Sequence, residues 1–251
     1  KTGGKMTNKT QGFRYIPGST DILIVAPHGP VIDGEYQNDK RTGIIAEEIQ
    51  QKLGCCAAIN DLFFKPTPTI PKSYANYLLD LFRIDHSKKV PGYLDRIREV
   101  ADCDGRTLIV WVHGIADKMA VTHGQVHIDK GLFDGDATQI DALIGYGQGG
   151  DPKSGETRDR FSARQETVEA FRDRLIAGGI TTLLTYTKGL NYRGRDSKRL
   201  NQWFNQLGYG FEQVESIQLE IKEQGLRDSD ENAARTGRII ARALSAMAGR
   251  K

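Results

Sequence analysis

The sequence predicts an α/β protein, a three-layer α/β/α sandwich whose central sheet is mostly parallel but mixed. Continuous apolar runs, rather than alternating ones, predict strands that are buried on both faces of a sheet. Amphipathic segments of helical length separate these runs along the chain, as in α/β folds. The 251 residues contain no internal repeat and no Pro- or Ser-rich linker, so one domain is expected.

In the first half of the chain, strands and helices are expected in alternation. DILIVA at Asp21–Ala26 and TLIVWV at Thr107–Val112 are continuous apolar runs and predict buried strands. Between them, Thr42–Leu53 places its isoleucines on one helical stripe, and Tyr93–Val100 has a similar pattern. Cys55–Ile59 is a weaker strand candidate.

The second half continues this alternation. Ala142–Ile144 is a weak strand candidate, and TTLLT at Thr181–Thr185 predicts a buried strand. A helix is expected over Ser162–Ile176, where Ser162 followed by Gln165 resembles a capping box. The last helix is expected over Glu231–Ala248, with an apolar stripe of alanine, isoleucine, leucine and methionine.

Ser216–Lys222, SIQLEIK, is the one strand candidate that alternates strictly. Its apolar residues point to one face, and Gln218, Glu220 and Lys222 point to the other. This pattern places Glu220 on a polar face near the end of the strand. The same pattern also fits an edge strand with a polar outer face.

The composition argues against two classes of protein, those that bind nucleic acids and those that span a membrane. The formal net charge of +3 is spread over interleaved basic and acidic residues, which does not indicate a nucleic-acid partner. No apolar run is long enough for a membrane span. The three cysteines lack metal-site spacing and are odd in number, so we expect a reducing, cytoplasmic environment. We divide the chain into an N-terminal extension, residues 1–20, and a single α/β domain, residues 21–251.

Two buried strand candidates end in a histidine followed by glycine. ILIVAP leads into His28, and LIVWV leads into His113. Ligands of open α/β sheets bind outside the carboxyl ends of the strands, so these two imidazoles are placed where they can converge. The alternative is that each histidine only forms a hydrogen bond to a nearby loop.

A catalytic zinc site takes three protein ligands and keeps one position open for water. Two carboxylates that follow His28, Glu35 and Asp39, are candidates for the third ligand. Asp39 is the better one because it stands just before the helix expected at Thr42, where the helix dipole favours a carboxylate. Helix capping is the alternative role for Asp39. Glu220 is a candidate general base for such a site, able to accept a proton from water and return it to a leaving amine.

Five short segments, APHG, DKRTGIIAEEI, YLLDLFR, LIVWVHG and SIQLEI, occur in this order between about Ile22 and Arg227. With them the chain resembles the N-formylglutamate amidohydrolase family, which is related to poly-γ-glutamate hydrolases and, more distantly, to zinc carboxypeptidases. The resemblance implies a zinc carboxypeptidase-like, phosphorylase/hydrolase-like sandwich. It covers nearly the whole domain, although each motif is short.

The resemblance also implies residue roles. His28, Asp39 and His113 look like the ligands of one Zn²⁺ ion, and Glu220 looks like the catalytic glutamate. Arg83 matches an arginine that would anchor a substrate carboxylate, a task that suits its planar fork. Arg195 is a second candidate for that contact, with plain solvent exposure as the alternative.

The chain departs from the family pattern beside Arg83. Phe82 stands where asparagine is usual, and Asn76 stands where an arginine often precedes the motif. The metal chemistry is therefore better defined than the substrate.

The sequence thus predicts a zinc-dependent amidohydrolase whose small amide or peptide substrate carries a carboxylate. A zinc peptidase or amidase acting on γ-glutamyl, peptidoglycan or C-terminal peptide bonds is the enzymatic alternative. The non-enzymatic alternative is an inactive ligand-binding or scaffold protein with the same fold.

Overall fold

The structure is a computed structural model that describes residues 12–29, 39–66, 72–103, 105–115, 117, 140–147, 161–184 and 196–247. Seven strands among these residues form one sheet, in the order β1-β3-β2-β4-β7-β5-β6. The strands are β1 (Phe13–Ile16), β2 (Ile22–Ala26), β3 (Cys56–Asn60), β4 (Thr107–Ile115), β5 (Ala142–Gly145), β6 (Thr182–Leu184) and β7 (Val214–Lys222).

The sheet is mixed, with a parallel centre. The neighbours β3, β2, β4 and β7 all run in one direction. β1 is antiparallel to β3 at one edge. At the other edge β5 is antiparallel to β7 and parallel to β6. The predicted α/β class, with a mostly parallel but mixed sheet, is confirmed.

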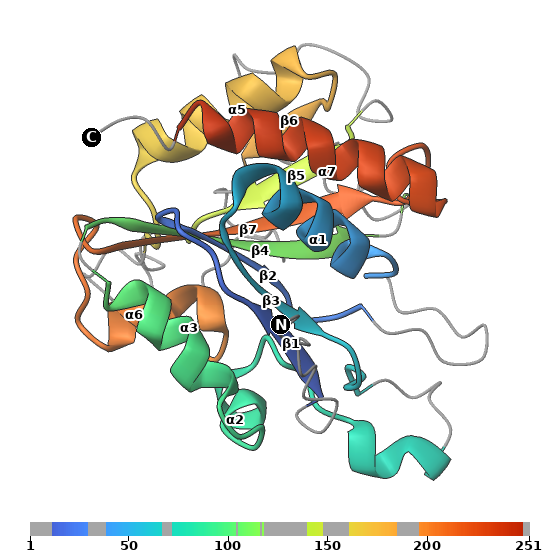
Figure 1. The fold of residues 1–251 in the computed structure, drawn as a ribbon, viewed down its shortest axis with the longest axis vertical. Coiled ribbons are helices and arrows are strands. Elements are labelled where there is room, and N and C mark those ends of the chain that lie inside the picture. The colour runs from blue at the N-terminus through green and yellow to red at the C-terminus, as the bar shows by residue number, and fades with distance from the viewer. Residues whose placement is uncertain are drawn as a thin grey trace, which may run out of the picture.

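Helices cover both faces of this sheet (Figure 1). α1, α5 and α7 pack on one face, and α2, α3 and α6 lie on the other, each side with its own apolar cluster. The helices are α1 (Thr42–Leu53), α2 (Ile84–Ser87), α3 (Tyr93–Ala101), α5 (Gln165–Ala177), α6 (Trp203–Gln206) and α7 (Asp230–Ser245), with 3-10 turns η1 (Lys72–Tyr77) and η4 (Leu200–Gln202). None of the helices in the described ranges has the length and apolar character needed to cross a bilayer.

Long-range pairing moves two element boundaries away from the sequence prediction. β4 continues past Val112 to Ile115 because its whole length pairs with β7. Residues 13–16 form β1, so the sheet includes part of the segment that we expected to lie outside the domain, before residue 21. This strand is only four residues long and mixes polar with apolar side chains, so it left no continuous apolar run to detect.

The capping box expected at Ser162 and Gln165 is wrong. α5 begins at Gln165, and Arg164 precedes it without a capping hydrogen bond from its side chain. The backbone N–H of Ser162 donates to Tyr146 O, and Ser162 O accepts from the N–H of Ser216, each at 2.7 Å. These contacts hold residue 162 against β7, so it cannot start the helix.

The alternating strand lies inside the sheet, not at an edge. β7 pairs with β4 on one side and with β5 on the other. Ile217, Leu219 and Ile221 join the apolar cluster under α1, α5 and α7. The polar residues Gln218 and Glu220 therefore project to the opposite face, where they are buried.

Candidate metal centre

Three side chains from separate parts of the chain meet at the carboxyl end of the parallel strands. His28 follows β2, His113 lies in the last third of β4, and Asp39 stands three residues before α1. All three are buried, and each offers a ligand atom such that the three atoms lie within 4.8 Å of one another. The centroids of the two imidazole rings are 5.0 Å apart, a separation that two metal bonds of ~2.1 Å can bridge.

Local hydrogen bonds hold the segments that carry His28 and Asp39 together. The Thr42 hydroxyl oxygen lies 2.5 Å from His28 O and 2.9 Å from Asp39 O, so the first residue of α1 contacts both segments. Asn60, at the end of β3, donates from Nδ2 to Pro27 O at 2.7 Å. Asp39 Oδ1 in turn accepts the backbone N–H of Gly114 at 2.9 Å, which ties it to β4.

Each imidazole has one nitrogen without a hydrogen bond. Asp39 Oδ1 lies 3.1 Å from His113 Nδ1 and 3.4 Å from His28 Nδ1. Both His28 Nδ1 and His113 Nε2 are buried and accept or donate no hydrogen bond among the described residues, but His28 Nδ1 faces Asp39 Oδ1 whereas His113 Nε2 faces no such partner. Leaving a buried polar atom unpaired costs about 1–3 kcal/mol. Two imidazole nitrogens of this kind beside a carboxylate are a donor set that suits Zn²⁺.

The other nitrogen of His28 is bound by a carboxylate that our sequence analysis did not assign. His28 Nε2 lies 2.7 Å from Asp80 Oδ1, and both side chains are buried. Asp80 is itself fixed, because its Oδ1 accepts the Phe82 N–H at 3.0 Å and its Oδ2 accepts from Arg199 Nη1 at 2.5 Å. A metal-binding histidine commonly donates its second N–H to a carboxylate, which fixes its tautomer and orientation. Asp80 lies in the segment YLLDLFR, three residues before Arg83. Its place in this motif is the feature of the sequence that could have identified it.

The charges in the site shift the pKa of each group in a definite direction. Burial lowers the pKa of His28, but the carboxylates of Asp39 and Asp80 outweigh it and raise this pKa to about 9. Burial lowers the pKa of His113 to about 4, with Asp39 only partly opposing it. Burial opposes ionisation of Asp39, yet His28 and His113 hold the pKa of its carboxyl well below the usual range. Without a metal, His28 is therefore the protonated member of the His28–Asp39–His113 group at neutral pH.

Glu220 lies next to this group on the adjacent strand. The parallel register of β4 and β7 places Glu220 beside His113, and their side chains share one face of the sheet. Gln218 Nε2 donates to Glu220 Oε1 at 2.5 Å. Burial, followed by the negative charge of Asp39, raises the pKa of Glu220 to about 8. A carboxyl group with this pKa can both accept and release a proton near neutral pH.

An aromatic ring packs against the site at the position where the family pattern has asparagine. The Phe82 ring meets the His113 ring edge-on, with centroids 4.4 Å apart. The Arg199 guanidinium carbon lies 5.9 Å from the centroid of the same ring. Phe82 therefore gives the site an apolar surface that contacts the His113 imidazole and lies close to the Arg199 guanidinium.

The remaining candidates lie further out or outside the described residues. Arg83 precedes α2, and its Nε and Nη2 donate to the two carboxylate oxygens of Asp85, each at 3.0 Å. Its side chain is about one third exposed. Arg195 and Glu35, the alternative third ligand, are not among the described residues.

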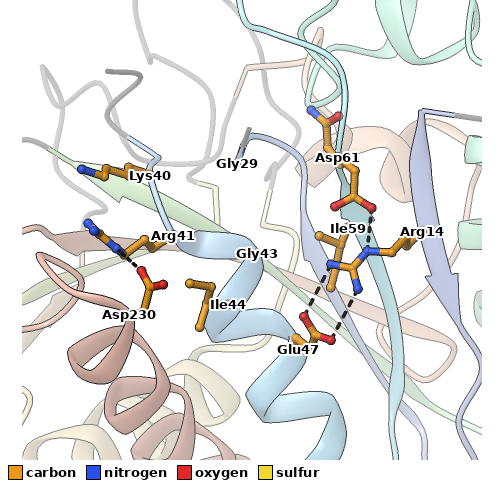
Figure 2. Close-up of a pocket in the computed structure, with 11 residues that line it drawn as sticks. Arg14, Gly29, Lys40, Arg41, Gly43, Ile44, Glu47, Ile59, Asp61 and Asp230 are labelled. Carbon is orange, nitrogen blue, oxygen red and sulfur yellow. Dashed lines mark hydrogen bonds and ion pairs between the residues drawn. The ribbon is translucent and has the colours of Figure 1, made fainter. Parts of the chain in front are cut away.

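A cavity of about 420 Å³ adjoins the site on the α1 side of the sheet (Figure 2). Gly29 and Lys40 line it, and each directly follows a candidate ligand, but none of His28, Asp39, His113 or Glu220 does. The arginines on its wall are paired: Arg14 with Asp61 and Glu47, and Arg41 with Asp230. The cavity is thus a neighbour of the candidate metal centre and lies apart from its proton-transfer groups.

Comparisons with known proteins support the fold. The sequence matches no protein-family model and no curated protein. The structure is similar to the crystal structure of N-formylglutamate amidohydrolase from Ralstonia eutropha JMP134, with a TM-score of 0.58 and 12% identity over 95% of this chain and 97% of that one. The resemblance drawn from the short motifs is therefore confirmed at the level of the fold.

Two further structures are weaker matches. A bacteriophage poly-γ-glutamate hydrolase has a TM-score of 0.49 and 10% identity over 96% of this chain and 92% of that chain. A metallo-carboxypeptidase from Pseudomonas aeruginosa has a TM-score of 0.48 and 12% identity over 94% of this chain and 60% of that chain.

Proposed function

We propose that this protein is a zinc-dependent amidohydrolase that cleaves an amide bond next to a carboxylate-bearing group. The observation that carries the proposal is the buried group of His28, Asp39 and His113, whose ligand atoms lie within 4.8 Å of one another. His113 Nε2, which is buried and forms no hydrogen bond to the described residues, supports it, since a bound cation removes the cost of leaving this atom unpaired. Its fold neighbour from Ralstonia eutropha is an N-formylglutamate amidohydrolase, which agrees with this chemistry.

Each residue has a defined task in this proposal. His28, Asp39 and His113 hold the metal, and Asp80 keeps His28 in the tautomer that leaves Nδ1 free to bind it. A zinc ion held by these residues would supply Lewis acidity, which would lower the pKa of a water molecule from 15.7 toward ~7.

Glu220 performs the proton transfers. Its Oε1 is held by Gln218, which leaves Oε2 to take the proton from the attacking water. Glu220 then delivers this proton to the nitrogen of the leaving amine. A pKa of about 8 suits both steps, because neither protonation state is strongly disfavoured near neutral pH.

The substrate is proposed to be a small molecule or peptide with a carboxylate near the scissile amide. Arg83 and Arg195 remain the candidates to bind that carboxylate. Arg83 would exchange its exposed partner Asp85 for the substrate, and a pair at such a surface is weak, typically worth 0–1 kcal/mol. The orientation gained by holding the substrate in this way can lower the reaction barrier by several kcal/mol.

The cysteines bear on where the protein works. All three, Cys55, Cys56 and Cys103, are free thiols, and the first two are buried. We propose the cytoplasm as its compartment, because thiols persist where glutathione and thioredoxin keep them reduced.

The decisive experiment combines metal analysis with activity. We expect one zinc ion per chain in the wild type and in Glu47→Gln, a control in the adjoining cavity, and none in Asp39→Ala. The zinc-loaded protein is then assayed with N-formyl-L-glutamate, a γ-glutamyl chain, a peptidoglycan fragment and a peptide with a free C-terminus.

Three outcomes discriminate between the functions. Hydrolysis of N-formyl-L-glutamate supports the proposal, and hydrolysis of only the other substrates indicates a zinc peptidase or amidase. A protein that takes up no zinc and is equally stable after Asp39→Ala is a binding or scaffold protein, and the proposal is then wrong.

A further inference from the structure

Arg227, in the turn after β7, is an arginine without any exposed surface. Its guanidinium donates to three backbone carbonyls: from Nε to Ile221 O at 2.9 Å, from Nη1 to Lys40 O at 3.0 Å, and from Nη2 to Ile115 O at 2.9 Å. No ion pair joins it to a carboxylate of the described residues. A buried cation is costly unless it is paired, so a position that keeps one requires an explanation.

Each of the three carbonyls belongs to a residue that lies one or two positions after a residue of the proposed site. Lys40 directly follows Asp39, Ile221 directly follows Glu220, and Ile115 lies two residues after His113. One planar group thus connects the segment before α1 with the ends of β4 and β7. These are the segments that present two of the three proposed ligands and the proposed base.

The turn that carries Arg227 is itself anchored. Thr236 of α7 donates from its hydroxyl to Leu226 O at 2.7 Å, and the backbone N–H of Arg227 donates to Glu223 O at 3.0 Å. From the opposite side, Arg41 Nη1 donates to Arg227 O at 3.2 Å. Arg41 has a φ of 67° and is the only non-glycine residue in the described ranges with a positive φ. Such a backbone costs roughly 1–2 kcal/mol, so the surrounding contacts hold it there.

The charge of Arg227 acts on the same residues. Arginine stays protonated in proteins, and Arg227 faces the negative charges of Asp39 and Glu220 as well as those of Glu223 and Asp117. A lysine at this position would keep the charge but lacks the rigid fork that spans three carbonyls.

We propose that Arg227 is a positioning residue that sets the spacing of Asp39, His113 and Glu220. This inference rests on the proposed zinc hydrolase function. Arg227 touches neither zinc nor substrate in this proposal. It holds the backbone beside each of the three residues, so its loss separates the ligands from one another and the base from the water.

The test uses Arg227→Met, which removes charge and donors at similar length, and Arg227→Lys, which keeps the charge. Arg172→Met is the matched control, because Arg172 is also a buried arginine (5% exposed) but lies on α5 and pairs with Asp173. Zinc affinity is measured by competition with a chromophoric chelator, and thermal stability is recorded for every variant. Turnover is then measured on zinc-saturated protein with the substrate that the wild type hydrolyses.

We expect zinc affinity to fall roughly 10- to 100-fold in Arg227→Met, as for other residues that orient metal ligands. We expect kcat to fall ~10²-fold while KM changes little, because a displacement of about 1 Å costs that much. Arg227→Lys should recover part of both, and Arg172→Met should lose stability alone.

The proposal is overturned if the folded Arg227 variants bind zinc as tightly as the wild type and keep its kcat. It is also overturned if neither variant folds, because Arg227 then has a purely structural role. A wild type that binds no zinc instead contradicts the proposed function itself. The two failures are therefore distinguished by the wild-type titration.

Discussion

Replacing Asp80 with asparagine tests whether this residue orients His28 for metal binding. The amide keeps an oxygen at the position of Oδ1, which receives the Phe82 N–H and lies 2.7 Å from His28 Nε2. It places an NH₂ group where Oδ2 now accepts from Arg199. Arg199 is 27% exposed and has Asp196 within 3.5 Å, so it can turn away from the amide. The main change at the site is therefore the loss of the negative charge behind His28.

The size of the effect follows from that single contact. A hydrogen bond to a charged group contributes ~1.5–3 kcal/mol, about twice the value for a neutral pair. Exchanging the carboxylate for an amide therefore removes about 1–2 kcal/mol, which corresponds to a zinc affinity roughly 5- to 30-fold weaker. This range overlaps the ~10- to 100-fold loss that is typical when the partner of a metal-binding histidine is removed.

The assay is a zinc titration against a chromophoric chelator, with circular dichroism to check that the variant is folded. Asp85→Asn is the matched control, since Asp85 is exposed and pairs with Arg83 instead of a histidine. Its zinc affinity should equal that of the wild type. If folded Asp80→Asn also binds zinc within about twofold of the wild type, Asp80 does not orient His28 and our account of the site is wrong on this point.

Four further predictions concern protons and metal at the same site. Zinc binding at pH 7.5 should release at least about one proton, because the pKa of His28 is raised to about 9 in the metal-free site. Calorimetry in buffers of different ionisation enthalpy measures this release, and zero release would contradict the assignment. Removing zinc with a chelator should lower the melting temperature, and the difference should grow with the zinc concentration of the untreated sample. An unchanged melting temperature would exclude a metal bound to the native state. Glu220→Gln should keep zinc but lower turnover ~10²-fold or more, and unchanged turnover would remove Glu220 from the mechanism. The folded-state pKa of Glu220 is raised, so its contribution to stability is full below about 4.5 and is lost as pH rises through about 8. Metal-free Glu220→Gln should therefore gain stability relative to the metal-free wild type as pH rises from about 4.5 to about 8, and a difference that does not change over this range would contradict the raised pKa.

Much of the fold could be predicted because its elements follow local rules. The helix at Thr42–Leu53 has the predicted bounds, since an apolar stripe defines it and Gly54, with a φ of 62°, ends it in the left-handed region. The buried runs of β2 and β4 were recognisable because strands covered on both faces need apolar side chains throughout. Where prediction failed, at Ser162 and at β1, the deciding hydrogen bonds join residues that are far apart in the sequence.

The residues of the candidate site could likewise be predicted in part from the sequence. His28, His113 and Glu220 could be selected from sequence because each polar residue follows or interrupts an apolar strand pattern, and such positions lie at the edge where α/β sheets bind ligands. Asp39 could be selected as a carboxylate just before a predicted helix. The sequence alone left it as an expectation that these side chains lie together. In the structure His28, Asp39 and His113 form one buried group.

The sequence by itself determined which segments become strands and helices and which polar residues stand at their ends, because these depend on contacts a few residues apart. The tertiary structure alone decided that Asp80 supports His28 across 52 residues, that Arg199 reaches Asp80 across 119, and that Arg227 reaches Lys40 across 187. The periodic pattern of apolar residues in the sequence does not predict such long-range pairs. They arise because the parallel strands bring their carboxyl ends to one edge, where a buried polar group must take its partner from whichever segment folds beside it.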